Sequence, residues 1–191
     1  RDQYRLGLIP AAWEHSVVAS LDKVYDEAKK RGFGDKDEKG VSWDDGFRKW
    51  KFADDKAATA AEAQTISFTF WDNKPEYDVE WKYDSASNSY KRFNGGKSHT
   101  DWEFDKPQLS AKNLVIMFVK EKGPVDREFH MFYETLGEGK ALYFRNGMVE
   151  EGTWEKATAL DREVFYDNNG KELTFVRGPI WIEAVPSGNT V

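Results

Sequence analysis

The spacing of apolar residues along the chain is helical before residue 64 and changes afterwards. Near the N-terminus, four residues repeat at i, i+3, i+4 and i+7, namely Leu21, Val24, Tyr25 and Ala28. Ser20 can cap the start of this segment, and a basic last turn leads to Gly32. The pattern predicts an amphipathic helix that begins after Ser20 and ends before Gly32.

A second short helix is predicted around Trp43, Phe47 and Trp50, which are spaced four and three residues apart. Residues 53–64 then contain many alanines and polar residues but no large apolar side chain. Because such a segment cannot bury a core of its own, we interpret it as an extended linker and as the boundary between two regions.

After residue 64 the apolar period becomes two, which is typical of strands with one solvent-facing side. The alternating residues are Ile66, Phe68 and Phe70, then Tyr77, Val79, Trp81 and Tyr83, and later Phe129, Met131 and Tyr133. The run from Leu114 to Val119 is continuously apolar and predicts a central strand that is buried on both faces.

Turn residues between these runs predict hairpins. Asn146-Gly147 lies between two strand-like segments and is the preferred pair for a type I′ turn, which needs positive φ at both positions. A second hairpin is predicted around Asp167–Gly170, and a last strand over 181–185. Short strands joined mostly by tight turns indicate an antiparallel sheet that curls or splits into two layers.

These elements predict an α+β fold in a chain of 191 residues. We expect a helical segment over 1–63, followed by a mainly antiparallel β-rich domain over 64–191.

Composition narrows the possible functions. The net charge of −6 argues against a general nucleic-acid binder, because such a protein needs a basic surface. The sequence has no cysteine, which excludes disulfides, thiolate metal sites and a cysteine nucleophile. No apolar run approaches the roughly 18 residues of a membrane helix, so we expect no membrane insertion. No complete phosphate-loop, dinucleotide, calcium or zinc motif is present, and we expect no cofactor and no metal.

The candidate binding residues are Arg92, His99 and Asp101, which surround the turn Asn94–Gly96. Asp101 could orient His99 and raise its pKa, as a general base or a ligand requires. The alternative is a polar turn whose side chains hold their own loop in place by hydrogen bonds. Residues and spacing leave both interpretations open.

Tryptophans suggest one more possibility. Trp71, Trp81 and Trp102 are close in sequence and could form a sugar-stacking platform, although aromatic residues are also ordinary core material in a sheet. Acidic residues stand near them, at Glu76, Glu80 and Glu103. A glycosidase needs two carboxyl groups at a defined separation, which the sequence alone leaves open.

Several blocks of sequence, taken in order, resemble a known family. They include VEWKYD at 79–84, YKRFNGGKSHTD at 90–101 and AKNLVI at 111–116, and then GEGKA, NG, GTW, FYD, GKE and GPIWI between 137 and 182. These blocks are similar to the YerB-like lipoproteins of bacteria, a family with a two-part domain of unknown function. The resemblance covers about residues 64–186, mainly the family's C-terminal domain. Trp13–Ser16 and the helix after it resemble only the end of the first domain.

The resemblance implies an extracytoplasmic protein at the cell envelope, anchored through an upstream lipid-modified segment that this chain does not contain. It implies no agreed reaction, so no catalytic residue is assigned. The start at Arg1 agrees with a fragment excised from a longer protein. We therefore expect a non-enzymatic module that binds an unknown envelope protein or glycan. The alternatives are a hydrolase of envelope polymers that uses His99 and Asp101, and a carbohydrate-binding module that uses exposed tryptophans.

Overall fold

The computed structural model describes residues 3–5, 17–37, 39–42, 44–101 and 107–191. The chain divides into two compact units, Arg1–Phe47 and Arg48–Val191.

In the first unit, β1 (Gln3–Arg5) pairs antiparallel with β2 (Val17–Ala19), and α1 (Leu21–Lys30) follows. Ser20 occupies the N-cap position, and Gly32 has a positive φ of 75° just after the helix. The predicted helix is thereby confirmed. Its apolar stripe is exposed at Leu21, Val24 and Tyr25. None of the helices that the structure describes is long and apolar enough to cross a membrane.

The helix predicted around residues 43–50 is wrong. Residues 44–46 form a turn, and the chain then runs into the short strand β3 (Lys51–Ala53), while Trp43 lies outside the described residues. The Trp50 indole donates a hydrogen bond of 2.9 Å to the carbonyl oxygen of Glu163 and packs against Phe165 and Phe175. Packing on the second unit therefore overrides the local helical spacing. That unit begins at Arg48, and the domain boundary expected at residue 63 stays a prediction.

The second unit contains a five-stranded antiparallel sheet. Its strands are β4 (Thr65–Phe68), β5 (Val79–Asp84), β6 (Ser89–Asn94), β7 (Lys97–Ser98) and β8 (Ser110–Ala111). The order is β4-β5-β6-β7, and β8 also pairs with β6.

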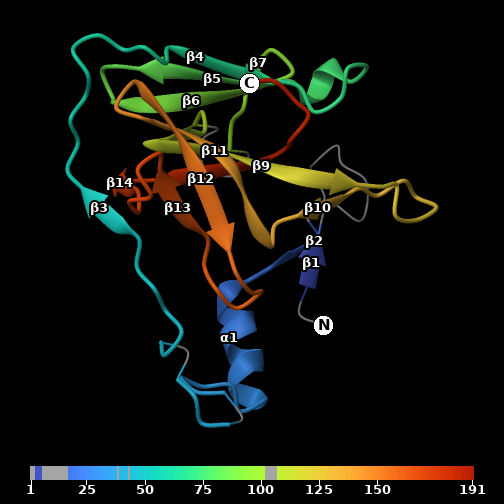
Figure 1. The fold of residues 1–191 in the computed structure, drawn as a ribbon. Helices are drawn as coiled ribbons and strands as arrows, with labels where there is room; N and C mark the ends of the chain where they lie inside the picture. Colours follow the sequence, from blue (N-terminus) through green and yellow to red (C-terminus); the bar gives the residue numbers. More distant parts are fainter. Residues whose placement is uncertain (1–2, 6–16, 38, 43, 102–106) are drawn as a thin grey trace. The chain divides into compact units, whose positions relative to one another are not determined.

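A six-stranded sheet forms the second layer (Figure 1). Its strands are β9 (Asn113–Lys122), β10 (Phe132–Glu134), β11 (Gly137–Arg145), β12 (Met148–Lys156), β13 (Val164–Asp167) and β15 (Ile180–Pro186). The order is β10-β9-β11-β12-β13, and β15 pairs with β9 in parallel. The separate strand β14 (Thr174–Val176) pairs in parallel with β3. The fold is therefore α+β with mainly antiparallel sheets, as predicted.

Strand β9 is the centre of the core. Leu114 and Ile116 pack in one apolar cluster with residues of the five-stranded sheet, and Val115 and Met117 pack in a second cluster on the opposite face. Alternation along one strand thus fills two cores, which confirms the strand predicted to be buried on both faces.

The hairpin at Asn146-Gly147 is confirmed, with φ values of 55° and 78°. The second predicted hairpin forms but is short. At its turn the amide of Asp167 donates to the carbonyl of Lys171 at 2.9 Å, and next to it Tyr166 and Glu172 form an antiparallel bridge. β13 then pairs with β12, whereas β14 pairs with β3. The strand predicted from Phe129 is shorter, because Phe129 has a positive φ of 63° and β10 begins only at Phe132.

Candidate ligand-binding site

Arg92 joins the two sheets. It lies on β6, opposite Trp81 of β5, and its side chain is only 7% exposed. Its Nε donates to the Oε1 atom of Glu183 on β15 at 3.2 Å, and the Trp81 indole donates to the same oxygen at 3.3 Å. One buried carboxylate therefore receives donors from two neighbouring strands of the other sheet.

Two indole rings, which contact each other with centroids 5.3 Å apart, both lie against the Arg92 guanidinium. Its Cζ lies 5.8 Å from the ring centroid of Trp81 and 5.1 Å from that of Trp181. Trp81 is completely buried, so it is a core residue and cannot belong to an exposed sugar-stacking platform. Of the other two platform candidates, Trp71 is 41% exposed, and Trp102 lies outside the described residues, as Glu103 does.

His99 accepts a hydrogen bond from Arg92. Its Nδ1 lies 2.5 Å from the Nη1 of Arg92, and because a guanidinium can only donate, this nitrogen carries no proton. Burial and the charge of Arg92 lower the pKa of His99, while the charge of Glu183 opposes the shift. The imidazole is therefore held neutral with its proton on Nε2, whereas the sequence suggested a raised pKa.

Asp101 contributes to the same loop through its backbone, because its amide donates to the carbonyl of Pro107 at 2.9 Å. The hydrogen bonds of His99 go to Arg92 and Leu109 within the described part of the chain. The structure thus joins Arg92 to His99, but it does not join His99 to Asp101 by a hydrogen bond. Among the described residues, no group of three or more His, Asp or Glu side chains is placed to hold a metal ion.

A pocket of about 400 Å³ lies beside Arg92, and we call it the aromatic pocket. It is lined by Phe70, Trp71, Tyr77, Val79, Arg92, Asn94, Tyr133 and Ala184. The rings of Trp71 and Tyr77 stand nearly perpendicular, at 82°, with centroids 5.3 Å apart. Both side chains are more than two-fifths exposed, so they offer accessible ring surface at the pocket.

The loop that carries these rings is fastened to the end of β6. The Asn94 side-chain amide donates to the carbonyl of Glu76 in η2 (Pro75–Tyr77) at 2.8 Å, and the Gly95 amide donates to the carbonyl of Asp78 at 2.8 Å. A Cβ atom at Gly95 would stand 2.9 Å from the carbonyl oxygen of Glu76. The glycine turn next to Arg92 therefore allows the close approach of the loop and fixes it.

The sequence alone did not identify several residues of this site. Glu183 has one usable signal, because it is an acid on an otherwise apolar strand between Trp181 and Val185, at a position that alternation turns inward. Tyr133 and Ala184 had no such signal, because β10 and β15 reach the pocket only through the pairing of both strands with β9.

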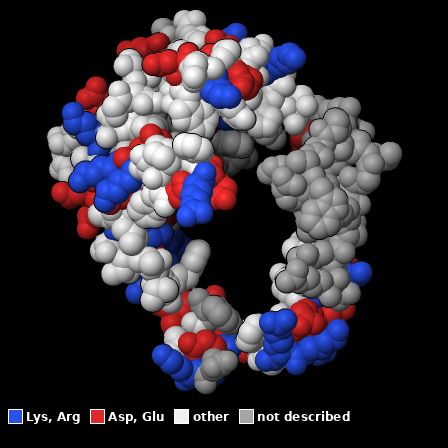
Figure 2. Space-filling view, turned by 90° about the vertical axis from the view of Figure 1, so that its right-hand side faces the viewer, with Lys and Arg blue, Asp and Glu red and all other residues white. Residues whose placement is uncertain are grey.

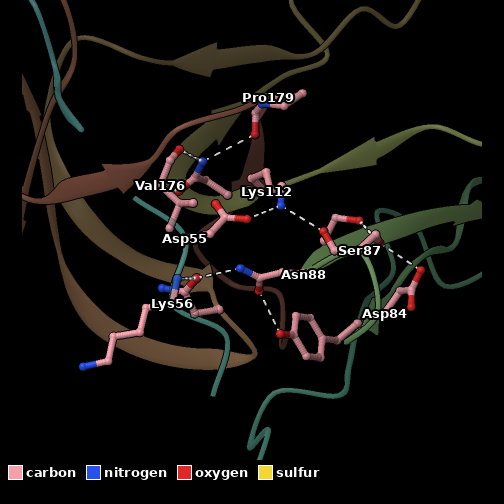
Figure 3. A network of polar contacts seen from close by, with 12 residues as sticks. Asp55, Lys56, Asp84, Ser87, Asn88, Lys112, Val176 and Pro179 are labelled. Carbon is pink, nitrogen blue, oxygen red and sulfur yellow. Dashed lines mark hydrogen bonds and ion pairs between the residues drawn. The ribbon is translucent and has the colours of Figure 1, made fainter. Parts of the chain in front are cut away.

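A second polar network fastens the segment after β3 to the five-stranded sheet (Figure 3). Lys112 contacts the carboxylate of Asp55 and donates to the carbonyl of Ser87 at 2.9 Å. The Asn88 side chain accepts from Tyr83 at 2.8 Å and donates to Asn146 at 3.0 Å. These polar groups are hydrogen-bond partners of one another, so we interpret the network as a structural link between turns.

Charged side chains of both signs are interspersed over the described residues that Figure 2 shows, where Lys and Arg lie among Asp and Glu.

The family follows from comparison with known sequences. Residues 66–182 match the family model described as "Protein of unknown function (DUF3048) C-terminal domain". The chain belongs to this family. The match runs from β4 into β15 and includes Arg92, His99 and Asp101.

One relative is the protein named "Putative lipoprotein YerB" from Bacillus subtilis (strain 168), which is 26% identical over 172 residues. The alignment covers 90% of this chain and 48% of the relative. The crystal structure of YerB from Bacillus subtilis superposes with a TM-score of 0.74 at 23% identity, covering 97% of this chain and 57% of that one. This DUF3048 chain thus shares the YerB fold and spans about half the length of this relative, which confirms the resemblance to YerB-like proteins.

Proposed function

We propose that this DUF3048 domain is a non-enzymatic binding module and that the aromatic pocket is its ligand site. One observation carries the proposal: a concave site of about 400 Å³ combines accessible rings with a buried, immobilised Arg92. Small-molecule sites typically have apolar walls and a few placed polar groups, and this pocket fits that description.

The location is proposed from the relative. Because this relative carries the name "Putative lipoprotein YerB", we assign this domain to the extracytoplasmic side of the cell envelope, where a lipid-modified segment of the whole protein would anchor it. The ligand is then a component of the envelope, either a glycan or part of a protein.

A hydrolase of envelope polymers is less well supported by the same geometry. A general base needs a free nitrogen directed at a substrate, and the unprotonated Nδ1 of His99 is occupied by Arg92. No carboxylate orients the imidazole through a hydrogen bond in the described residues, and His99 does not line the aromatic pocket. This arrangement favours binding over proton transfer.

The test uses a soluble digest of bacterial cell wall as the probe. Saturation-transfer NMR on the intact protein should detect bound components, and Trp71→Ala should weaken that signal at least about tenfold, because it removes one wall of the pocket. Phe129→Ala is the matched control, since Phe129 is 76% exposed and does not line the pocket.

Two results would overturn the proposal. One is binding that Trp71→Ala leaves unchanged, which would move the site elsewhere. The other is chemical conversion of the digest, followed by mass spectrometry, that wild type performs and His99→Ala abolishes at unchanged thermal stability.

A further inference from the structure

The hydrogen-bonding state of Arg92 indicates what kind of ligand the aromatic pocket accepts. Its Nε donates to Glu183, and its Nη1 lies within reach of both Asn94 at 3.3 Å and His99 at 2.5 Å. In the part of the chain that the structure describes, no group accepts from Nη2. A guanidinium has five N–H donors, so two of them remain available at a pocket that Arg92 lines.

This donor is fixed in position. The side chain is 7% exposed, and the guanidinium lies against the rings of both Trp81 and Trp181. A ligand oxygen that accepts from Nη2 therefore does not have to immobilise a mobile arginine, which removes an entropic cost of binding.

The charge of Arg92 is already balanced. Glu183 is its buried partner, and Arg92 is the only basic residue among those that line the aromatic pocket in the described chain. An anionic ligand would lose its hydration in the pocket without meeting a net positive charge, and that loss is costly. A neutral oxygen acceptor suits the site better, because it gains hydrogen bonds at a smaller desolvation cost.

The aromatic side chains that line the pocket indicate what the rest of the ligand is. Trp71 and Tyr77 pack edge to face at the pocket, and Phe70 lies beside Trp71 with centroids 5.8 Å apart. The negative face of an aromatic ring attracts C–H groups, which carry a small positive charge. A pyranose ring has such C–H faces and carries neutral oxygens around its rim.

We infer that the aromatic pocket binds a neutral saccharide, with a pyranose ring against Trp71 and Tyr77 and a ring oxygen, hydroxyl or amide carbonyl accepting from Nη2 of Arg92. This inference rests on the proposed function, because it names the ligand class of the same pocket. It predicts binding that is insensitive to salt, since no net charge is neutralised.

Calorimetric titration with the trimer of N-acetylglucosamine tests the inference. The trimer of galacturonic acid is the matched probe, because it has the same number of pyranose rings and a carboxylate on each. We expect saturable binding of the neutral trimer, unchanged in 0.5 M NaCl, and at least about tenfold weaker binding of the acidic one. Trp71→Ala should abolish the binding, and Trp71→Phe should restore part of it at unchanged melting temperature.

The outcomes separate this inference from the proposed function. If Trp71→Ala abolishes binding of the cell-wall digest but the neutral trimer does not bind, or the acidic trimer binds as tightly, the saccharide inference is overturned and the binding module stands. A peptide as the retained component has the same consequence. If neither the digest nor a trimer binds in a Trp71-dependent way, both proposals fail.

Discussion

Arg92 and Glu183 form a buried ion pair between two different sheets, with Nε and Oε1 3.2 Å apart and side chains that are 7% and 9% exposed. The partners are 91 residues apart in sequence. Because a buried charge is tolerated only when it is paired and hydrogen-bonded, each residue depends on the other. The pair therefore couples the packing of the sheets to the position of the donor at the aromatic pocket.

The first prediction concerns this pair. Glu183→Gln should lower the free energy of unfolding by about 3–5 kcal/mol, because it leaves the guanidinium buried without a countercharge. Urea denaturation measures the loss. Glu80→Gln is the control, because Glu80 pairs with Lys82 at the surface, where the side chains are 35% and 50% exposed, and should cost under about 1 kcal/mol. An equal loss of unfolding free energy in Glu183→Gln and Glu80→Gln would contradict the claim that burial makes the Arg92–Glu183 pair important for stability.

The second prediction is a pH dependence. The pKa of His99 is lowered from 6.5, so below pH 6.5 the unfolded chain binds more protons at this residue than the folded chain does. The contribution of His99 to the free energy of unfolding is fully present above pH 6.5. It is lost as the pH falls through the pKa that His99 has in the folded chain. His99→Asn keeps an acceptor for Arg92 but cannot titrate.

Urea midpoints between pH 7.5 and 5 measure the difference. We expect wild type to lose stability on acidification in this range more steeply than His99→Asn. Parallel curves would mean that His99 binds its proton equally well in the folded and the unfolded chain.

The local pattern predicted strands better than it predicted their partners. Period-two alternation identified β4 and β5 because each has one face in a core, and Asn146-Gly147 identified its hairpin because few residues adopt two consecutive positive φ values. Trp50 was assigned to a helix because its spacing to Phe47 is ambiguous. Only the distant rings of Phe165 and Phe175 decide its conformation.

The candidate site could be predicted only in part for the same reason. Arg92 and His99 are neighbours across a turn, so the sequence brought them together. Tyr133 and Ala184 join Arg92 at the pocket through strand pairings that leave no mark in the local pattern. The sequence shows that Glu183 is a charged residue at an inward-facing strand position. It does not show that Arg92 is its ion-pair partner.

The third prediction concerns Gly152 on β12. A Cβ atom there would stand 2.0 Å from the carbonyl oxygen of Tyr166 on β13 and 2.7 Å from the Tyr143 ring. Gly152→Ala should therefore destabilise the fold by about 1–3 kcal/mol or more, because backbone must move. Gly188→Ala is the control, since nothing lies within 4 Å of its Cβ position, and thermal unfolding compares the two. Similar melting temperatures would mean that β12 and β13 are not held this closely.

The fourth prediction concerns Asn113, which is 1% exposed at the start of β9. Its side-chain amide donates to the carbonyl of Val176 and accepts from the amide of Val176, both at 2.8 Å, so it replaces a strand neighbour for β14. Asn113→Leu leaves both backbone groups of Val176 without these partners and should cost about 2–4 kcal/mol. In Asn113→Leu we expect the hydrogen-exchange rate of the Val176 amide to rise, together with the loss of stability that urea denaturation measures. The control is Asn168→Leu in an exposed turn, which should change the free energy of unfolding by less than about 0.5 kcal/mol. An unchanged exchange rate at Val176 in Asn113→Leu would show that β14 is held by its pairing with β3 alone.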